Sequence, residues 1–165
     1  LMPGSMSLVT CATDIRKALE SKANHYGRPD LPMVIAINNL TSDFGRHDHN
    51  MEALFGQEVV RVMRESDDYS SEPCFDRLPN GAWRGPSGFR MKRVSAAIIV
   101  NGLNPFNVHS NQPILYHHPC PEKPISQEVL SITQYIPKEN RMVAVQGMAV
   151  VELLSLPPGF PPEDD

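Results

Sequence analysis

One stretch decides the fold: Asp14-Ile-Arg-Lys-Ala-Leu-Glu-Ser-Lys-Ala-Asn-His-Tyr26, then Gly27-Arg-Pro29, then Leu31-Pro-Met-Val-Ile-Ala-Ile-Asn38. The spacing of apolar residues in its first part predicts a helix with one buried stripe, which comprises Ile15, Ala18, Leu19, Lys22, Ala23 and Tyr26. Gly27 and Pro29 end this helix, because glycine suits a helix C-terminus and proline cannot continue it. The apolar run over residues 33–37 is typical of a strand buried on both faces.

A second apolar run, Val94-Ser-Ala-Ala-Ile-Ile-Val100, predicts another buried strand. The sequence therefore predicts an α/β (or α+β) single domain, with a mixed sheet that contains residues 33–38 and 94–101 and the 14–26 helix packed on one face. Residues 41–50 are expected to form a polar loop before a short helix over 51–55. Pro79-Asn80-Gly81 predicts a hairpin turn, with Trp83 on its return strand.

The expected domain spans residues 13–156, between a disordered or vector-derived start (residues 1–12) and a mobile, acidic, proline-rich tail (residues 157–165). The chain has 165 residues and a net charge of -4, so it lacks the general basic field of proteins that bind nucleic acid non-specifically. Its three cysteines are widely spaced, which favours free thiols in a reducing compartment. With no membrane span and no secretory signal in the sequence, the expectation is a cytoplasmic protein.

A local cluster of basic and aromatic residues stands apart from this acidic average: Trp83, Arg84, Arg90, Lys92 and Arg93. Aromatic rings stack on bases and cations contact phosphate, so the cluster is a candidate nucleic-acid site. The alternative is a hairpin with a solvated basic rim.

Two histidine groups are candidate metal ligands, His47-Asp48-His49 and His117-His118. Imidazole and carboxylate groups bind Zn²⁺, and carboxylates bind Mg²⁺, but neither group has the spacing of a known zinc module. Such a site requires the fold to bring the two groups together. The alternative is that both groups are ordinary solvent-exposed side chains that bind no metal.

Lys22 is the candidate catalytic residue, because it falls on the apolar stripe of the helix. Its ammonium group either extends to the rim of the stripe, as a solvated surface group, or is held inward beside an acidic site, where it could act in catalysis. The string Glu20-Ser21-Lys22 matches the carboxylate-x-lysine motif of metal-dependent nucleases only superficially, because on a helix its two ends point about 200° apart. Asn38, Asn39, Asn101 and Asn104 follow the two buried strands, where ligands often bind. Turn formation by asparagine explains them equally well.

Several segments together resemble the C-terminal portion of a family of uncharacterised bacterial cytoplasmic proteins with a restriction-endonuclease-like core. They are Ala18-Leu-Glu-Ser-Lys-Ala-Asn-His-Tyr26, residues 31–38, Glu52-Ala-Leu-Phe-Gly56, Trp83-Arg-Gly-Pro86, Arg93-Val-Ser-Ala-Ala97, Tyr116-His-His-Pro119 and Leu153-Leu-Ser-Leu-Pro157. The resemblance implies a nuclease-like fold associated with nucleic acid. A nuclease core also needs a strand-borne Asp and carboxylate-x-lysine ahead of the opening helix, and the short segment before Asp14 contains neither. The expectation is therefore a chain without its catalytic N-terminal half, or a member without nuclease chemistry.

Three functions follow from these observations. The first is the C-terminal part of a nuclease-like, nucleic-acid-associated protein, with Lys22 facing the site. The second is a non-catalytic structural or interaction module, which docks through Trp83 and the proline-rich strands and forms a homo-oligomer. The third is a small metal-dependent hydrolase that uses the histidine groups with Zn²⁺ or Mg²⁺.

Overall fold

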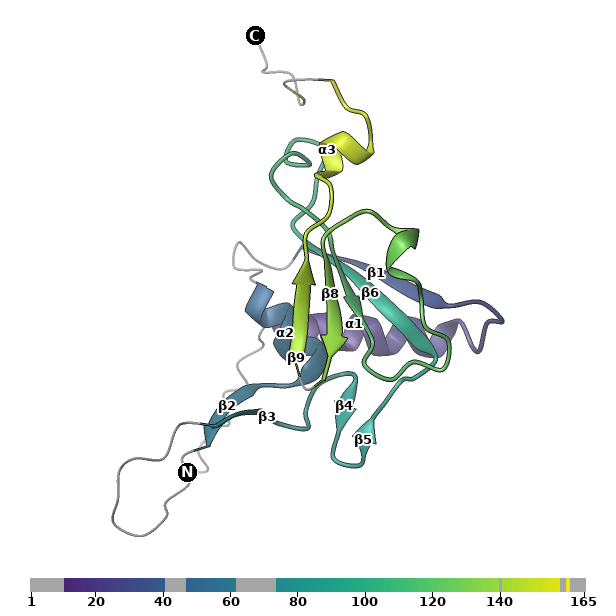
Figure 1. Ribbon diagram of the computed structural model, residues 1–165, viewed down its shortest axis with the longest axis vertical. Coiled ribbons are helices and arrows are strands. Elements are labelled where there is room, and N and C mark those ends of the chain that lie inside the picture. Colours follow the sequence, from purple (N-terminus) through teal and green to yellow (C-terminus); the bar gives the residue numbers. More distant parts are fainter. Residues whose placement is uncertain (1–10, 41–46, 62–73, 140, 158–159, 161–165) are drawn as a thin grey trace, which may run out of the picture.

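The computed structural model describes residues 11–40, 47–61, 74–139, 141–157 and 160. Its helices are α1 (Cys11–His25), α2 (His47–Phe55), the short α3 (Val150–Leu153) and the 3-10 helix η1 (Gln127–Val129) (Figure 1). Its strands are β1 (Met33–Asn39), β2 (Glu58–Arg61), β3 (Cys74–Arg77), β4 (Arg84–Gly85), β5 (Gly88–Phe89), β6 (Val94–Asn101), β7 (Ile114–His117), β8 (Gln134–Lys138) and β9 (Arg141–Val145). None of the helices in these ranges has the length and apolar character needed to cross a bilayer.

A mixed sheet of five strands organises the domain, in the order β1-β6-β7-β8-β9. β1 runs parallel to β6 and β7 parallel to β8, whereas the β6–β7 and β8–β9 pairs are antiparallel. The predicted mixed sheet is thus confirmed. Because β1 and β6 are parallel and in register, their last residues, Asn39 and Asn101, lie opposite each other. We call this edge the carboxyl end of β1 and β6, and the opposite edge their amino end.

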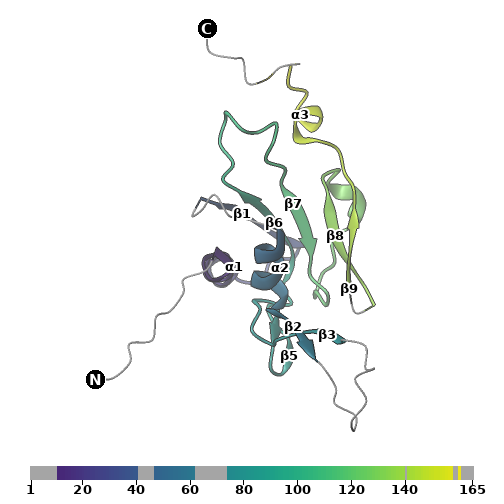
Figure 2. The same cartoon turned by 90° about the vertical axis from the view of Figure 1, so that its left-hand side faces the viewer.

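α1 and α2 cover one face of the sheet (Figure 2). Ile15 and Leu19 of α1 pack in one core cluster with Leu54 of α2 and with Ile37 and Ile99 of the sheet, and all five are at most 6% exposed. Burying one such side chain contributes roughly 1.5–3 kcal/mol, so this layer is the main source of stability. The predicted helix on one face of the sheet is confirmed.

Lys22 and Tyr26 were predicted on the buried stripe of α1, and both are exposed. The buried face of the helix consists of Ala12, Ile15, Leu19 and Ala23. Lys22 lies at the flank of this face, where its ammonium group stays in water and avoids the cost of burying a charge. Of the two alternatives for Lys22, the structure shows the surface position, and an inward-facing Lys22 is wrong.

The opposite face of the sheet is covered by the segment that carries η1. Ala96, Leu115 and Ile132 form a second, smaller buried cluster, against which Val34 and Ile98 pack. β6 is accordingly buried on both faces, as predicted. β1 is not: its burial alternates and Ala36 is exposed, because β1 is an edge strand that only β6 adjoins in the described sheet.

α2 begins at His47, four residues before the predicted short helix. The acidic side chain of Asp48 in its first turn favours this start, because a carboxylate stabilises the positive end of the helix dipole. His47, Asp48 and His49 therefore belong to a helix and not to a loop. Residues 41–46, the rest of the predicted loop, lie outside the described residues.

The predicted hairpin at residues 79–81 does not form. Asn80 instead accepts a hydrogen bond from the backbone N–H of Gln57 at 3.0 Å through its side-chain oxygen. Gly81 packs so closely on the backbone of Phe55 and Gly56 that a β carbon would overlap it. The segment therefore docks on the end of α2, and the tight hairpin lies further on, between β4 and β5.

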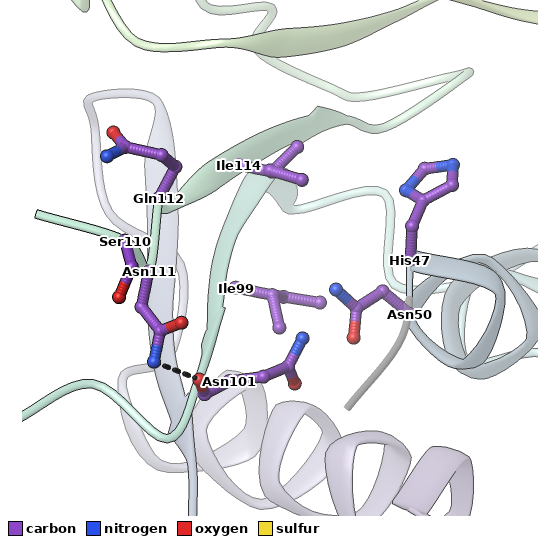
Figure 3. A pocket seen from close by; sticks show the side chains of 8 residues that line it. All are labelled: His47, Asn50, Ile99, Asn101, Ser110, Asn111, Gln112 and Ile114. Carbon is purple, nitrogen blue, oxygen red and sulfur yellow. Dashed lines mark hydrogen bonds between the residues drawn. The ribbon is translucent and has the colours of Figure 1, made fainter. Parts of the chain in front are cut away.

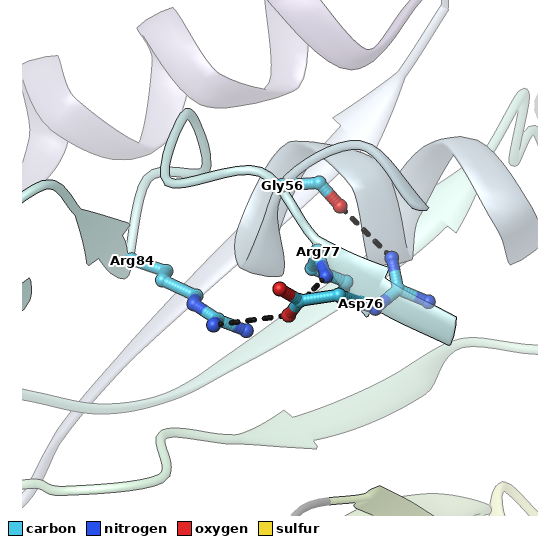
Figure 4. Close-up of polar contacts among 4 residues, drawn as sticks. All are labelled: Gly56, Asp76, Arg77 and Arg84. Atoms are coloured by element: carbon cyan, nitrogen blue, oxygen red, sulfur yellow. Dashed lines mark hydrogen bonds and ion pairs between the residues drawn. The ribbon is translucent and has the colours of Figure 1, made fainter. Parts of the chain in front are cut away.

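Side chains of the β2–β3 ribbon and β4 hold this region together (Figure 4). The Arg77 guanidinium donates to the carbonyl oxygen of Gly56 at 2.9 Å, at the C-terminal end of α2, where carbonyls lack helical partners. Arg84 forms an ion pair with Asp76, with 3.4 Å between Nη2 and Oδ1. The ribbon is thereby tied to both α2 and β4.

Candidate functional site

A cavity of about 180 Å³ opens at the carboxyl end of β1 and β6 (Figure 3). Four side-chain amides line it: Asn50, Asn101, Asn111 and Gln112. His47, Ser110, Ile99 and Ile114 complete the lining. We call this cavity the amide pocket. It is built by the first turns of α2, the end of β6 and the segment leading into β7.

The floor of the amide pocket is a hydrogen-bonded group of three side chains. Nδ1 of His47 lies 2.9 Å from the Tyr116 hydroxyl, and Asn50 donates to the same hydroxyl from Nδ2 at 3.2 Å. The Tyr116 hydroxyl is thus shared by His47 and Asn50, both from the first turn of α2. Asn50 is 1% exposed, and its Oδ1 atom has no hydrogen-bond partner among the described residues.

Asn111 and Gln112 are held by bonds to the backbone, and Asn101 by the side chain of Asn39. Nδ2 of Asn111 donates to the carbonyl of Asn101 at 3.1 Å, and the Asn101 Oδ1 atom accepts from Asn39 at 3.2 Å. Gln112 uses both ends of its amide, donating to the carbonyl of His109 and accepting from the N–H of Val150. Oδ1 of Asn111 and Nδ2 of Asn101 make no hydrogen bond within the described part of the chain.

None of the described residues that line the amide pocket is an Asp, Glu, Lys or Arg. Burial lowers the pKa of His47 from its ordinary value, with Asp48 opposing and Arg77 reinforcing the shift. Burial also raises the pKa of Tyr116 above its ordinary value, so its hydroxyl keeps its proton. The ring of His47 stacks on Tyr135, with 4.2 Å between centroids. The pocket therefore offers neutral donors and acceptors, which suit an uncharged polar ligand.

Three of the candidate metal ligands, His47, His117 and His118, make hydrogen bonds to other residues. His118 donates from Nε2 to the carbonyl of Arg90 at 2.8 Å and accepts from the N–H of Cys120 at Nδ1, so both ring nitrogens are occupied. His117 bonds to Gln134 at 2.7 Å. Among the residues that the structure describes, no three side chains of His, Cys, Asp or Glu form a group able to hold a metal ion.

Most of the predicted nucleic-acid residues gather at the amino end of β1 and β6. Arg90 reaches Glu20 of α1 at 3.5 Å, and the Arg93 guanidinium donates to Asn24 of the same helix. Two ion pairs join the neighbouring loops, Arg28–Glu122 at 3.9 Å and Lys123–Asp30 at 3.8 Å. We call the cations of these segments the basic end; they are Lys22, Arg28, Arg90, Lys92, Arg93 and Lys123.

Two members of the predicted nucleic-acid cluster lie elsewhere. Trp83 is 0% exposed and packs against Phe55 and His118, with centroids 5.4 and 4.9 Å away. Its ring therefore neither stacks on a base nor docks a partner, which corrects both expectations. Arg84 is paired with Asp76. Phe89 is the aromatic residue next to the basic end, and it is 44% exposed.

Asn101 was noted from the sequence, but Asn50, Asn111 and Gln112 were not. The sequence signal was partial, because asparagine after a strand indicated either a turn or a ligand site. Asn38 closes a turn by bonding the backbone of Leu103 in both directions, whereas Asn101 lines the amide pocket. A comparison of the chain with protein-family models, curated proteins and solved structures finds no match in any of the three.

Proposed function

We propose that this chain is a nucleic-acid-associated protein, of the nuclease-like class that its sequence resembles, and that its basic end contacts the phosphate backbone. One observation carries the proposal: segments distant in the sequence bring six cations together, and the carboxylates that pair with them in the described part of the chain are three, Glu20, Asp30 and Glu122. This local excess of positive charge contrasts with the net charge of -4 of the whole chain.

The ion pairs of the basic end leave its cations available to phosphate. The side chains of Arg90 and Glu20 are 53% and 36% exposed, and those of Arg28 and Glu122 are 78% and 46% exposed. Solvent screens such pairs so strongly that each is worth about 0–1 kcal/mol. A phosphate group that approaches from solvent competes effectively with them. Lys22 and Lys92 are exposed and form no ion pair within the described ranges.

Arg90 is held in position by its own stem, which packs over Gly85 so closely that a β carbon there would lie 2.5 Å from Cδ. Its neighbour Phe89 is partly exposed, in contact with the buried ring of His118. An exposed ring beside fixed cations is the arrangement that binds single strands by stacking and charge. The proposal therefore favours single-stranded over duplex nucleic acid.

The proposal concerns binding, not hydrolysis. Metal-dependent cleavage needs ligands that clamp a cation against phosphate, and the described residues include no such group. Lys22, proposed from the sequence beside a catalytic site, is assigned to phosphate contact instead.

The test is the salt dependence of binding to a fluorescent single-stranded oligonucleotide, followed by anisotropy. The affinity should fall steeply with salt, and the double variant Lys22→Ala/Lys92→Ala should reduce the slope of log K against log salt by about 1.4, for two lost contacts. The matched control is Lys138→Ala/Arg141→Ala, which removes two exposed cations from the β8–β9 hairpin. Equal effects of the two double variants would contradict the proposal.

A further inference from the structure

The amide pocket is a second site, separate from the basic end, and it holds a buried polar atom that the described residues leave unpaired. Oδ1 of Asn50 has no hydrogen-bond partner among the described residues, although the side chain is almost completely buried. Leaving such a group unpaired destabilises the fold, because nothing compensates its loss of contact with water. Exchanging the two ends of the amide leaves an unpaired N–H in its place. Because the atom is closed off from solvent, a turn of the Asn50 side chain toward the cavity is what lets a ligand pair with it and recover the cost.

Three amides of the pocket each have one end fixed and one end free. Asn50 is fixed by Tyr116, Asn111 by the carbonyls of Asn101 and Gly102, and Asn101 by Asn39. The free ends are two acceptors, on Asn50 and Asn111, and one donor, on Asn101. Because the fixed ends hold these groups in place, a ligand binds them with little loss of side-chain entropy.

The described lining favours an uncharged ligand of limited size. Within the part of the chain that the structure describes, it offers no Lys or Arg for a phosphate or carboxylate and no Asp or Glu for an amine. Ile99 and Ile114 add apolar surface to the set of donors and acceptors. The volume of about 180 Å³ lies below the roughly 300–1,000 Å³ of pockets for drug-sized ligands, so it suits one small ring system.

From these features we propose that the amide pocket binds a nucleobase, by the hydrogen-bonding edge of its ring. A base combines a flat apolar surface with neighbouring donors and acceptors, and side-chain amides of Asn and Gln match such an edge. The sugar and phosphate remain outside the cavity. The base comes from a free nucleoside or from an unstacked position in a single strand. The proposal does not depend on the basic end, which lies at the other end of the strands.

The test is a titration of the ¹⁵N-labelled protein with adenosine, guanosine, cytidine and uridine, followed by amide chemical shifts. At least one nucleoside should shift the signals of Asn50, Asn101 and Asn111. Ser110→Tyr places a ring at the exposed rim and should weaken binding at least ten-fold, whereas Ser110→Ala should leave it within two-fold. Asn101→Ala, which removes the free donor, should also weaken binding at least ten-fold.

Further arms identify the source of the base and separate this site from the basic end. A trinucleotide that binds more tightly than its nucleoside, and loses the gain in Lys22→Ala/Lys92→Ala, indicates a base in a strand. Equal affinities indicate a free nucleoside. Nucleoside binding that survives Lys22→Ala/Lys92→Ala supports the pocket even if the proposed function fails. Absence of binding by all four nucleosides at millimolar concentration, equal binding of glucose, or unchanged binding by Ser110→Tyr would overturn the inference.

Discussion

The Nδ1 atom of His47 lies 2.9 Å from the hydroxyl oxygen of Tyr116, so the first residue of α2 is joined to the middle of β7. The same hydroxyl accepts from Asn50, one turn further along α2. The start of the helix is thereby fixed on the sheet at the place where the amide pocket opens. The shape of the pocket and the stability of this contact are therefore linked.

Tyr116→Phe should destabilise the fold. The change removes the partner of the buried Asn50 Nδ2 group, which then remains unpaired, at a cost of about 1–3 kcal/mol. Urea unfolding measures the difference. Tyr135→Phe is the matched control, since the Tyr135 hydroxyl has no hydrogen bond within the described residues, and it should cost less than about 0.5 kcal/mol. Equal losses of unfolding free energy in the two variants would show that the Tyr116 hydroxyl contributes no more to stability than the Tyr135 hydroxyl.

The stability of the protein should fall as the pH is lowered below about 6.5. Burial lowers the pKa of His47 and of His118 in the folded state, relative to the ordinary value of 6.5. Between the folded pKa and 6.5 the unfolded chain binds more protons, so stability is complete above 6.5 and is lost as the pH falls. NMR titration of the two imidazole rings checks the cause directly. A midpoint at or above 6.5 for both rings would contradict it.

Trp83 should not report nucleic-acid binding by its fluorescence. Its ring is buried between Phe55 and His118, so acrylamide should quench it poorly and a bound oligonucleotide should leave its emission unchanged.

Phe89→Ala should weaken oligonucleotide binding by about 1 kcal/mol or more, because stacking on a base is worth about 1–3 kcal/mol. Strong quenching of Trp83 by the oligonucleotide would show that Trp83, and not Phe89, stacks on the bases.

Arg77→Met should destabilise the protein by about 1–2 kcal/mol. The variant keeps the apolar stem but removes the hydrogen bond to the carbonyl of Gly56, at the end of α2. Arg141→Met, an exposed residue of β9, serves as the control and should change stability by less than about 0.5 kcal/mol. Thermal unfolding of both variants measures this, and an undiminished midpoint for Arg77→Met would show that the contact is dispensable.

The main layer of the fold could be predicted from local patterns. Helical spacing located α1 and apolar runs located β1 and β6, because each element displays its buried face along a continuous stretch of sequence. The start of α2 was missed, since its first turn is polar: it is fixed by the contacts of His47 and Asn50 with Tyr116, 69 and 66 residues away.

The sites depend on contacts between distant residues and were only partly predictable. Trp83 stands in a polar, glycine-rich segment that suggests exposure, but the docking of this segment on α2 buries the ring. Arg90 and Arg93 were identified by composition, whereas their approach to Glu20 and Asn24 of α1 follows from the register of β6 beside β1. The amide pocket has no sequence motif, because three separate segments supply its lining.

The central claim, that the basic end contacts nucleic acid, is tested most directly by mapping where a bound strand lies. Amide spectra of the ¹⁵N-labelled protein, recorded with increasing single-stranded oligonucleotide, give this map. The account predicts shifts concentrated in residues 20–30, 88–93 and 122–123, with β8 and β9 unperturbed and the shifts lost at high salt. Shifts confined to β9 and α3, or no shifts at low salt, would contradict it.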